Sequence, residues 1–406
     1  MTTSYPFRRI SAIFVLSMVL CSMPFALERP GSVGQEALDP STLSAVWKYT
    51  RNESEATFWK LAWSPDGSLI AATFFDGTCV VLSSADGSVT RVIDLNLPAT
   101  RCDGYSPEGT LPLRACAFSP DGKYLALGGD DTRVPVFDTS TWERKWTFIG
   151  HTGSVLCLDF SPDSRYLASG SGTDKVIPQN AGENVTRIWD MTTGRQVLAL
   201  PAHRDGVLSV KWSHAGDRLA TASDDRTVKV WSFPEGDELA VCKGHTSGVL
   251  DVVWTPDDLD LLSGSRDYKI KVWNSSSGAL LSTWSDYNCV RSVDVHPGGE
   301  LAATSCVDLT LKIRDIRTGT ELKVIKDGME QNAMVMCSRW SPDGRTLASG
   351  LGKSHTVMLY GFGGAPERVD QGWSGALTLS LMAVLAVVFI ALLFYPALQR
   401  IRRERR

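Results

Sequence analysis

Apolar and polar residues alternate along many short segments between residues 43 and 362, and tight-turn sequences separate these segments. Alternation with a period of two is typical of a strand with one buried face, and the intervening Asp, Gly, Pro and Ser residues favour turns. In the clearest copy, the predicted strands span residues 207–212, 218–223, 227–231 and 238–242. The pattern therefore predicts a unit of four short antiparallel strands.

This four-stranded unit is repeated seven times along the chain. In each copy a bulky residue precedes a turn sequence such as Ser-Pro-Asp-Gly, and these leading residues are Trp63, Phe118, Phe160, Trp212, Trp254, Val295 and Trp340. The steps between them are 55, 42, 52, 42, 41 and 45 residues, and a period near 42 with occasional insertions indicates a repeat architecture. Because one unit cannot bury both faces of its sheet, the seven units are expected to stack around an axis.

Two further motifs recur at fixed places in the unit. Third strands end in a tryptophan followed by a polar residue, as in Trp189-Asp190, Trp231-Ser232 and Trp273-Asn274. A histidine follows the fourth strands, as in Gly150-His151, Ala202-His203 and Gly244-His245. In these motifs the chain resembles the WD40-repeat family over roughly residues 43–362. The resemblance implies an all-β fold, a seven-bladed WD40 β-propeller, of the kind that serves as an interaction scaffold.

The resemblance also implies a buried hydrogen-bonded set made of a histidine, a strand-two hydroxyl, a turn aspartate and a tryptophan. The matching residues are His203, Thr221, Asp225 and Trp231, then His245, Ser263, Asp267 and Trp273, and, with a glutamate in place of the aspartate, His151, Ser169, Glu183 and Trp189. A catalytic triad would use similar residues, but buried polar groups must be paired, which favours a structural network. The last repeat has Ser354 and no matching histidine, so its network is expected to be absent or filled by water.

The last repeat lacks a fourth strand of its own, because the propeller pattern stops near Tyr360-Gly361. Residues 43–50 precede the first leading residue much as residues 143–148 precede the third. An open ring would leave strand edges unpaired. We therefore expect the N-terminal strand at about 43–50 to complete the last blade.

Two large insertions interrupt the period, at residues 96–112 before the second repeat and at 172–182 within the third. One lies between a fourth strand and the next first strand, the other between strands two and three, so antiparallel strands place both on the same side of the ring. Insertions gathered on one side often mark a binding face, although drift in exposed loops costs little stability. The predicted contact residues are Arg101, Asp103, Tyr105, Asp174, Lys175 and Gln179.

The C-terminal region predicts a membrane span. Residues 376–394 carry no charge and are rich in Leu, Val and Ala, which is the length that a bilayer-spanning helix needs. We expect a linker at 363–373, a transmembrane helix at 374–395 and a basic cytoplasmic tail at 396–406. A buried core helix is the alternative, but no other helix is expected for it to pack on.

The N-terminal region is consistent with export. Arg8 and Arg9 precede an apolar run and small residues follow it, as in a secretory signal peptide. Residues 1–26 are therefore expected to be a signal peptide or an uncleaved signal anchor, followed by a linker at 27–42. Both basic ends would then be cytoplasmic and the propeller extracytoplasmic.

Charge and cysteine content narrow the partner classes. Without residues 1–9 and 400–406 the chain has 34 Lys and Arg against 44 Asp and Glu, a net charge of −10, which disfavours a nucleic-acid surface. The cysteine spacing offers no metal cluster. A disulfide between Cys102 and Cys116, which would close the loop before the second blade, is one possibility. The other is that Cys116 is an ordinary core residue.

The sequence thus predicts a membrane-tethered WD40 scaffold or sensor that presents a face for a protein or peptide outside the cytoplasm, without a catalytic, cofactor or metal site. One alternative is a membrane-anchored regulator facing the cytosol, similar to the exchange factors of the secretory pathway. A second alternative is a propeller enzyme. The sequence offers few candidate catalytic residues for an enzyme. Three of the six histidines occupy the network positions, and His214 and His296 lie in turns.

Overall fold

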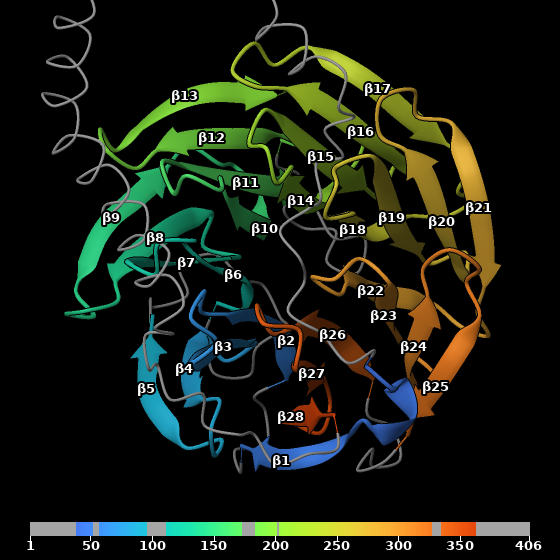
Figure 1. Ribbon diagram of the computed structural model, residues 1–406. Helices are drawn as coiled ribbons and strands as arrows, with labels where there is room; N and C mark the ends of the chain where they lie inside the picture. The colour runs from blue at the N-terminus through green and yellow to red at the C-terminus, as the bar shows by residue number, and fades with distance from the viewer. Residues whose placement is uncertain are drawn as a thin grey trace, which may run out of the picture. The chain divides into compact units, whose positions relative to one another are not determined.

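The computed structural model describes residues 38–51, 57–95, 111–172, 183–200, 203–326 and 334–362. Over these residues the chain forms seven four-stranded antiparallel sheets, which lie as blades around a central channel (Figure 1). The predicted all-β, seven-bladed propeller is confirmed. The blades follow one another in chain order, so each repeat in the sequence corresponds to one blade, apart from the exchange of one strand at the closure.

Within each blade the strands run from the channel outwards to the rim. The first strands are β2 (Phe58–Trp63), β6 (Leu113–Phe118), β10 (Ser154–Phe160), β14 (Val207–Trp212), β18 (Val249–Trp254), β22 (Val290–Val295) and β26 (Val335–Trp340). The second strands are β3 (Leu69–Phe74), β7 (Tyr124–Gly129), β11 (Tyr166–Gly172), β15 (Arg218–Ser223), β19 (Asp260–Ser265), β23 (Leu301–Cys306) and β27 (Thr346–Leu351). The third strands are β4 (Thr78–Ser83), β8 (Arg133–Asp138), β12 (Thr186–Asp190), β16 (Thr227–Ser232), β20 (Lys269–Asn274), β24 (Leu311–Asp315) and β28 (Thr356–Gly361). The rim strands are β5 (Val89–Asp94), β9 (Arg144–Ile149), β13 (Arg195–Leu200), β17 (Glu238–Lys243), β21 (Leu280–Ser285), β25 (Glu321–Ile325) and β1 (Ser44–Thr50).

The hydrophobic core lies between neighbouring blades. All six residues of the first strand β6 are buried, whereas five of the six residues of the rim strand β5 are exposed. Between the fourth and fifth blades, for example, Val228 and Val230 pack in one cluster with Val249 and Val252. Each sheet therefore buries its faces only when a blade stands on either side of it, which is why the repeat needs a closed ring.

The ring is closed by the N-terminal strand. β1 pairs antiparallel with β28, so the seventh blade has the order β1-β28-β27-β26. A short 3₁₀ helix (Pro40–Thr42) precedes β1, and Lys323 Nζ on the sixth blade donates to the carbonyl of Ser41 at 2.6 Å. The Trp47 indole N–H donates to the carbonyl of Ser84 on the first blade at 2.8 Å. The 3₁₀ helix and β1 together thus contact three consecutive blades.

Every first strand contains a bulge near its start, where the pairing with the second strand skips one residue. The skipped residues are Trp59, Arg114, Leu156, Leu208, Leu250, Arg291 and Met336. A bulge re-aims a side chain out of the usual alternation. Because the first strands surround the channel, this irregularity places one extra side chain per blade at the channel opening.

The two sides of the ring differ in their loops. We call the side on which the first strands begin, formed by loops between fourth and first strands and between second and third strands, the insertion face. The opposite side, formed by the turns after the first and third strands, is the turn face. The insertions at 96–112 and 172–182 connect β5 to β6 and β11 to β12, so both belong to the insertion face.

Some predicted segments lie outside the described residues. They are 1–26, most of the linker at 27–42, 363–373, 374–395 and 396–406. Among the described residues, the structure contains no helix with the length and apolar character that a membrane crossing requires.

Candidate partner-binding face

The channel opens on the insertion face through the seven skipped residues, which together we call the mouth. Each lies four positions before the leading residue of its repeat, as Trp59 lies before Trp63 and Leu208 before Trp212. A hollow of about 50 Å³ at this opening is lined by Trp59, Lys60, Leu156, Leu208, Leu250, Arg266, Arg291 and Met336. The bulges therefore bring residues from six blades into one small recess.

One side of the mouth is built from aromatic rings and arginines. The rings of Trp59 and Phe75 are stacked, with centroids 4.8 Å apart. The Arg114 guanidinium lies 5.0 Å from the Trp59 ring and 5.1 Å from the Phe75 ring, and the Arg291 guanidinium also lies 5.0 Å from Trp59. Arg114 donates two hydrogen bonds to the Asp130 carboxylate, at 2.5 and 3.1 Å, and this two-point contact fixes the orientation of its guanidinium group.

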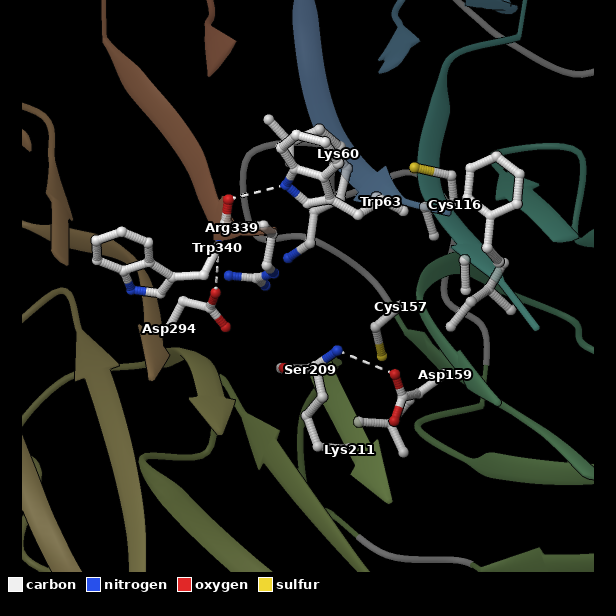
Figure 2. Close-up of a pocket in the computed structure, with 17 residues that line it drawn as sticks. Lys60, Trp63, Cys116, Cys157, Asp159, Ser209, Lys211, Asp294, Arg339 and Trp340 are labelled. Atoms are coloured by element: carbon white, nitrogen blue, oxygen red, sulfur yellow. Dashed lines mark hydrogen bonds and ion pairs between the residues drawn. The ribbon is translucent and has the colours of Figure 1, made fainter. Parts of the chain in front are cut away.

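Below the mouth the channel widens into a cavity of about 220 Å³ lined by charged side chains (Figure 2). Lys211 Nζ lies 3.0 Å from Asp159 Oδ1. The Asp294 carboxylate accepts a hydrogen bond from the Trp340 backbone N–H at 2.7 Å. Burial raises the pKa of Asp294. The nearby Arg339 and the hydrogen bond from Trp340 lower it by less, so the pKa stays above its usual value. The cavity thus contains both cationic and anionic side chains among apolar ones.

Asp251, on the first strand β18 of the fifth blade, is completely buried. Its carboxylate accepts hydrogen bonds from the hydroxyls of Ser209 and Ser292 at 2.8 and 2.9 Å and from Arg339 Nη2 at 2.9 Å. Burial alone would raise the pKa of Asp251, but Arg339, Lys60 and Lys211 hold it well below its usual range. Asp251 thus ties first strands from four blades together.

The predicted histidine networks form in the fourth and fifth blades. His203 Nδ1 lies 2.9 Å from Asp225 Oδ2, His203 Nε2 lies 2.8 Å from Thr221 Oγ1, and the Trp231 indole N–H donates to the same hydroxyl at 2.9 Å. A carboxylate can only accept, so the proton between His203 and Asp225 is carried by Nδ1.

The fifth blade repeats this arrangement. His245 lies 2.8 Å from both Asp267 and Ser263, and the Trp273 indole N–H donates to Ser263 at 2.8 Å. Every polar atom that a triad would use is already hydrogen-bonded inside the blade. The arrangement therefore holds the loop after a rim strand against the turn between strands two and three.

The third blade corrects the prediction for Glu183. His151 Nε2 lies 2.6 Å from Ser169, and Trp189 donates to Ser169 at 2.8 Å, but Glu183 pairs with Arg187 at 2.7 Å. Within the described part of the chain, His151 Nδ1 has no hydrogen-bond partner. Burial, with a smaller effect from Arg187, lowers the pKa of His151 to about 3. The longer side chain of Glu183 forms an ion pair with Arg187, four residues later in the chain, and the His151 imidazole stays neutral.

In the seventh blade, Ser354 is a buried hydroxyl without a hydrogen-bond partner among the described residues. Tyr360 occupies the position of the tryptophan. The histidine set is absent here, because this repeat has no matching histidine.

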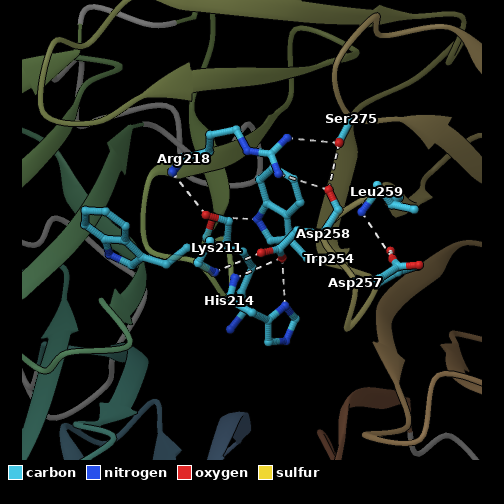
Figure 3. Close-up of polar contacts among 12 residues, drawn as sticks. Lys211, His214, Arg218, Trp254, Asp257, Asp258, Leu259 and Ser275 are labelled. Atoms are coloured by element: carbon cyan, nitrogen blue, oxygen red, sulfur yellow. Dashed lines mark hydrogen bonds and ion pairs between the residues drawn. The ribbon is translucent and has the colours of Figure 1, made fainter. Parts of the chain in front are cut away.

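The turn face is occupied by contacts between blades (Figure 3). The Asp258 carboxylate of the fifth blade accepts hydrogen bonds from His214 Nδ1 and from the backbone N–H groups of His214 and Ala215, all at 2.8–2.9 Å. Arg218 lies 4.8 Å from the Trp254 ring and donates to Ser275 at 3.1 Å. These groups join the fourth blade to the fifth, so His214 has a structural role.

Several sequence-predicted residues lie outside the described residues, namely Arg101, Asp103, Tyr105, Asp174, Lys175, Gln179 and Cys102. Cys116 is buried, and its thiol lies 3.8 Å from the Ala71 carbonyl. The disulfide to Cys102 stays a prediction. Across the described residues, no group of three His, Cys, Asp or Glu side chains is arranged to hold a metal ion.

The mouth is the feature that the sequence analysis did not identify. A usable signal is present, because the mouth residue always stands four positions before the leading residue. The alternation pattern does not reveal this signal. In a regular strand, neighbouring residues such as Trp59 and Lys60 point to opposite faces, whereas in the structure both line the hollow.

Comparison with known proteins shows where this architecture recurs. The family model described as "WD domain, G-beta repeat" matches residues 103–138, 142–177, 194–232, 236–274, 278–315 and 320–361. A second model, the WD40 domain of anaphase-promoting complex subunit 4, matches residues 40–106.

Three curated proteins illustrate the range of relatives. Protein tipD of Dictyostelium discoideum is 30% identical over 263 residues, which are 61% of this chain and 41% of tipD. Protein HIR1 of Gibberella zeae is 30% identical over 181 residues, 40% of this chain and 16% of HIR1. A guanine nucleotide-binding protein subunit beta of Arabidopsis thaliana is 25% identical over 316 residues, 74% of this chain and 67% of that protein. The chain therefore spans less than half the length of the first two.

Proposed function

The chain belongs to the WD40-repeat family, and we propose that it is a membrane-tethered scaffold or sensor that binds a protein or peptide on its insertion face. One observation carries the choice of face. The mouth, with its aromatic, aliphatic and cationic side chains, opens on the same side as the insertions at 96–112 and 172–182. Loops on a rigid scaffold are where binding residues concentrate.

The proposal assigns shape and polar contacts to the propeller and no bond chemistry. Its support is that the histidines nearest to a triad arrangement, His203 and His245, are hydrogen-bonded to Asp and to Thr or Ser within their own blades. Each of these hydroxyls also accepts from a tryptophan. For one of these hydroxyls to act as a nucleophile, its hydrogen bonds to the histidine and the tryptophan would first have to break.

Membrane tethering and an extracytoplasmic propeller are further parts of the proposal, and they rest on the sequence. The support is the uncharged run at 376–394 and the five arginines within residues 400–406. A tether raises the effective concentration of a bound partner at the membrane. Protease treatment of sealed right-side-out vesicles tests the orientation. A digested propeller supports it, and a protected propeller supports the cytosol-facing alternative.

Affinity capture tests the insertion face. The wild-type chain is compared with a variant in which the insertions at 96–112 and 172–182 are both shortened to the loop length of the other blades. We expect partners to be lost from the variant while its unfolding midpoint stays within a few degrees of wild type. Equal recovery of every partner would refute the assignment of this face.

A further inference from the structure

Three stretches of the chain carry the acceptor motif for N-linked oligosaccharides, Asn-x-Ser/Thr. They are Asn52-Glu53-Ser54, Asn184-Val185-Thr186 and Asn274-Ser275-Ser276. The motif is short and recurs by chance, so the surroundings of each asparagine have to distinguish them. The first motif lies outside the described residues. The second precedes β12 on the insertion face, and the third ends β20 on the turn face.

The asparagine of the second motif is poorly placed to carry a bulky group. Thr186, whose hydroxyl the motif requires, is completely buried. The side-chain oxygen of Asn184 is also buried, and it lies so close to Gly172 that a Cβ added there would approach it to 3.0 Å. An attached oligosaccharide is bulky and needs a surface position, so Asn184 is unsuitable.

The asparagine of the third motif presents its amide nitrogen at the surface. Asn274 is half-buried and Ser276 is exposed. The Asn274 side-chain oxygen accepts hydrogen bonds from the Ser277 backbone N–H at 3.0 Å and from the Ser277 hydroxyl at 2.8 Å. Because a backbone N–H can only donate, these bonds identify the oxygen of the amide. The amide nitrogen is not a buried atom, and it has no hydrogen-bond partner among the described residues.

The turn itself does not need this nitrogen. In three other blades an aspartate stands at the same position, and its carboxylate accepts the same bond from the backbone N–H three residues later, at 2.8–3.3 Å. These aspartates are Asp138, Asp190 and Asp315. An aspartate would therefore close the fifth-blade turn as well. The asparagine adds one free NH₂ group, which is the group that N-linked glycosylation modifies.

The residue between Asn274 and Ser276 anchors the turn to the blade. The Ser275 hydroxyl donates to the Asp258 carbonyl at 2.9 Å and accepts from Arg218 at 3.1 Å (Figure 3). The Ser275 backbone N–H donates to the Leu259 carbonyl at 2.9 Å. Ser275 is buried, whereas Ser276 is exposed. A group attached to the Asn274 nitrogen would thus leave these contacts in place.

We propose that Asn274 is a site of N-linked glycosylation. A bond forms between Nδ2 and the anomeric carbon of the first sugar, and the bond from that carbon to the phosphate of a lipid-linked oligosaccharide donor breaks. The phosphate leaves with the electron pair, and a base of the host transferase takes one proton from Nδ2. The inference rests on the proposed function, because this modification occurs on exported chains. The oligosaccharide covers the turn face and leaves the insertion face free for a partner.

Peptide mass spectrometry of the full-length chain, purified from membranes of its natural host, tests the proposal. The chain is produced there as wild type and as Asn274→Gln, Asn184→Gln and Asp138→Asn. The Asp138 substitution is the matched positive control. It completes the acceptor motif with Thr139 and Ser140 in the equivalent turn of the second blade, where Ser140 is exposed. Gel mobility before and after enzymatic removal of N-linked sugars gives a second readout.

Wild type is expected to carry an oligosaccharide on the peptide that contains Asn274 and none on the peptide that contains Asn184. Asn274→Gln should lose this mass, Asn184→Gln should retain it, and Asp138→Asn should gain a second modified peptide. An unmodified Asn274 in wild type overturns the proposal. If Asp138→Asn is modified in that case, the extracytoplasmic position of the propeller stands. If neither site is modified, protease treatment of sealed right-side-out vesicles shows whether that position fails as well.

Discussion

Asp267 and Glu183 stand at the same position in two repeats, but their side chains have different partners. Asp267 bonds to the buried His245 at 2.8 Å, whereas Glu183 pairs with Arg187 and leaves His151 Nδ1 without a partner. Residues at one position of the motif therefore make different contacts. The pair offers a comparison in which the position is matched and the contact differs.

We expect Asp267→Asn to lower the free energy of unfolding by about 1–3 kcal/mol, because it weakens the buried hydrogen bonds of His245 and leaves one partner poorly satisfied. Glu183→Gln should cost less than about 1 kcal/mol, since it removes only a partly exposed ion pair. Urea unfolding at pH 7 measures both. Equal losses for the two variants would contradict the network assignment.

The same variant gives a pH test. Burial raises the pKa of Asp267, but the hydrogen bond from His245 and the backbone N–H of Thr246 outweigh it and lower the pKa to about 2. An aspartate in an unfolded chain has a pKa of about 3.9. The stabilisation by Asp267 is therefore complete above about pH 4 and is lost as the pH falls through 2. The stability difference between wild type and Asp267→Asn should shrink over that interval, and a constant difference would be inconsistent with this pKa.

Residue motifs predicted the networks of His203 and His245 because their members recur at fixed positions in regular blades. The motif alone could not predict the partner of Glu183. Arg187 is present in the sequence. Whether the Glu183 carboxylate pairs with Arg187 or with His151 depends on the side-chain geometry after the 172–182 insertion.

Among the elements, β1 is the strand that closes the ring. It completes the seventh blade through its pairing with β28, and its neighbour Leu43 is buried in the cluster between the sixth and seventh blades. The sequence predicted this strand because the last repeat has only three strands of its own. The edge that an open blade would expose needs a partner.

Deletion of residues 43–50 should destabilise the whole propeller. The loss of Leu43 burial alone amounts to roughly 1.5–3 kcal/mol, and an entire strand ladder is lost with it. Thermal unfolding followed by circular dichroism and by tryptophan fluorescence should show both midpoints lowered together. Deletion of residues 30–37, equally long but outside the strand, is the control. A 43–50 deletion that melts like the full chain would show that β1 is dispensable.

The bulges are elements of the fold that alternation does not reveal. Residues such as Arg114 and Leu250 read in the sequence as ordinary strand positions, and only the pairing with the second strand shows that each is skipped. The number of blades and the two faces followed from the period. The mouth did not, because it depends on one irregular residue repeated in seven strands.

At the scale of the whole molecule, the ring is joined through its centre as well as through its rim. Asp251 connects the first strands β14, β22 and β26 to its own strand β18 by hydrogen bonds. Four of the seven blades thus depend on one carboxylate. Such a contact couples the blades more directly than nearest-neighbour packing does.

Asp251→Asn should lower the free energy of unfolding by about 3–5 kcal/mol, because it leaves Arg339 buried without its counter-charge. Asp159→Asn is a suitable comparison. Its ion pair with Lys211 lies where both side chains remain partly exposed, at 20% and 26%, and should cost less than half as much. Denaturant unfolding measures the two. If Asp251→Asn were the milder of the pair, the central linkage would be wrong.

The central claim is that a partner binds the insertion face at the mouth. Site-specific photocrosslinking tests it most directly, with benzoylphenylalanine placed at Leu208 in the mouth or at Leu259, an exposed residue of the turn face shown in Figure 3. We predict that light produces a crosslinked partner from position 208 and none from position 259. A partner crosslinked from position 259 and absent from position 208 would contradict the claim.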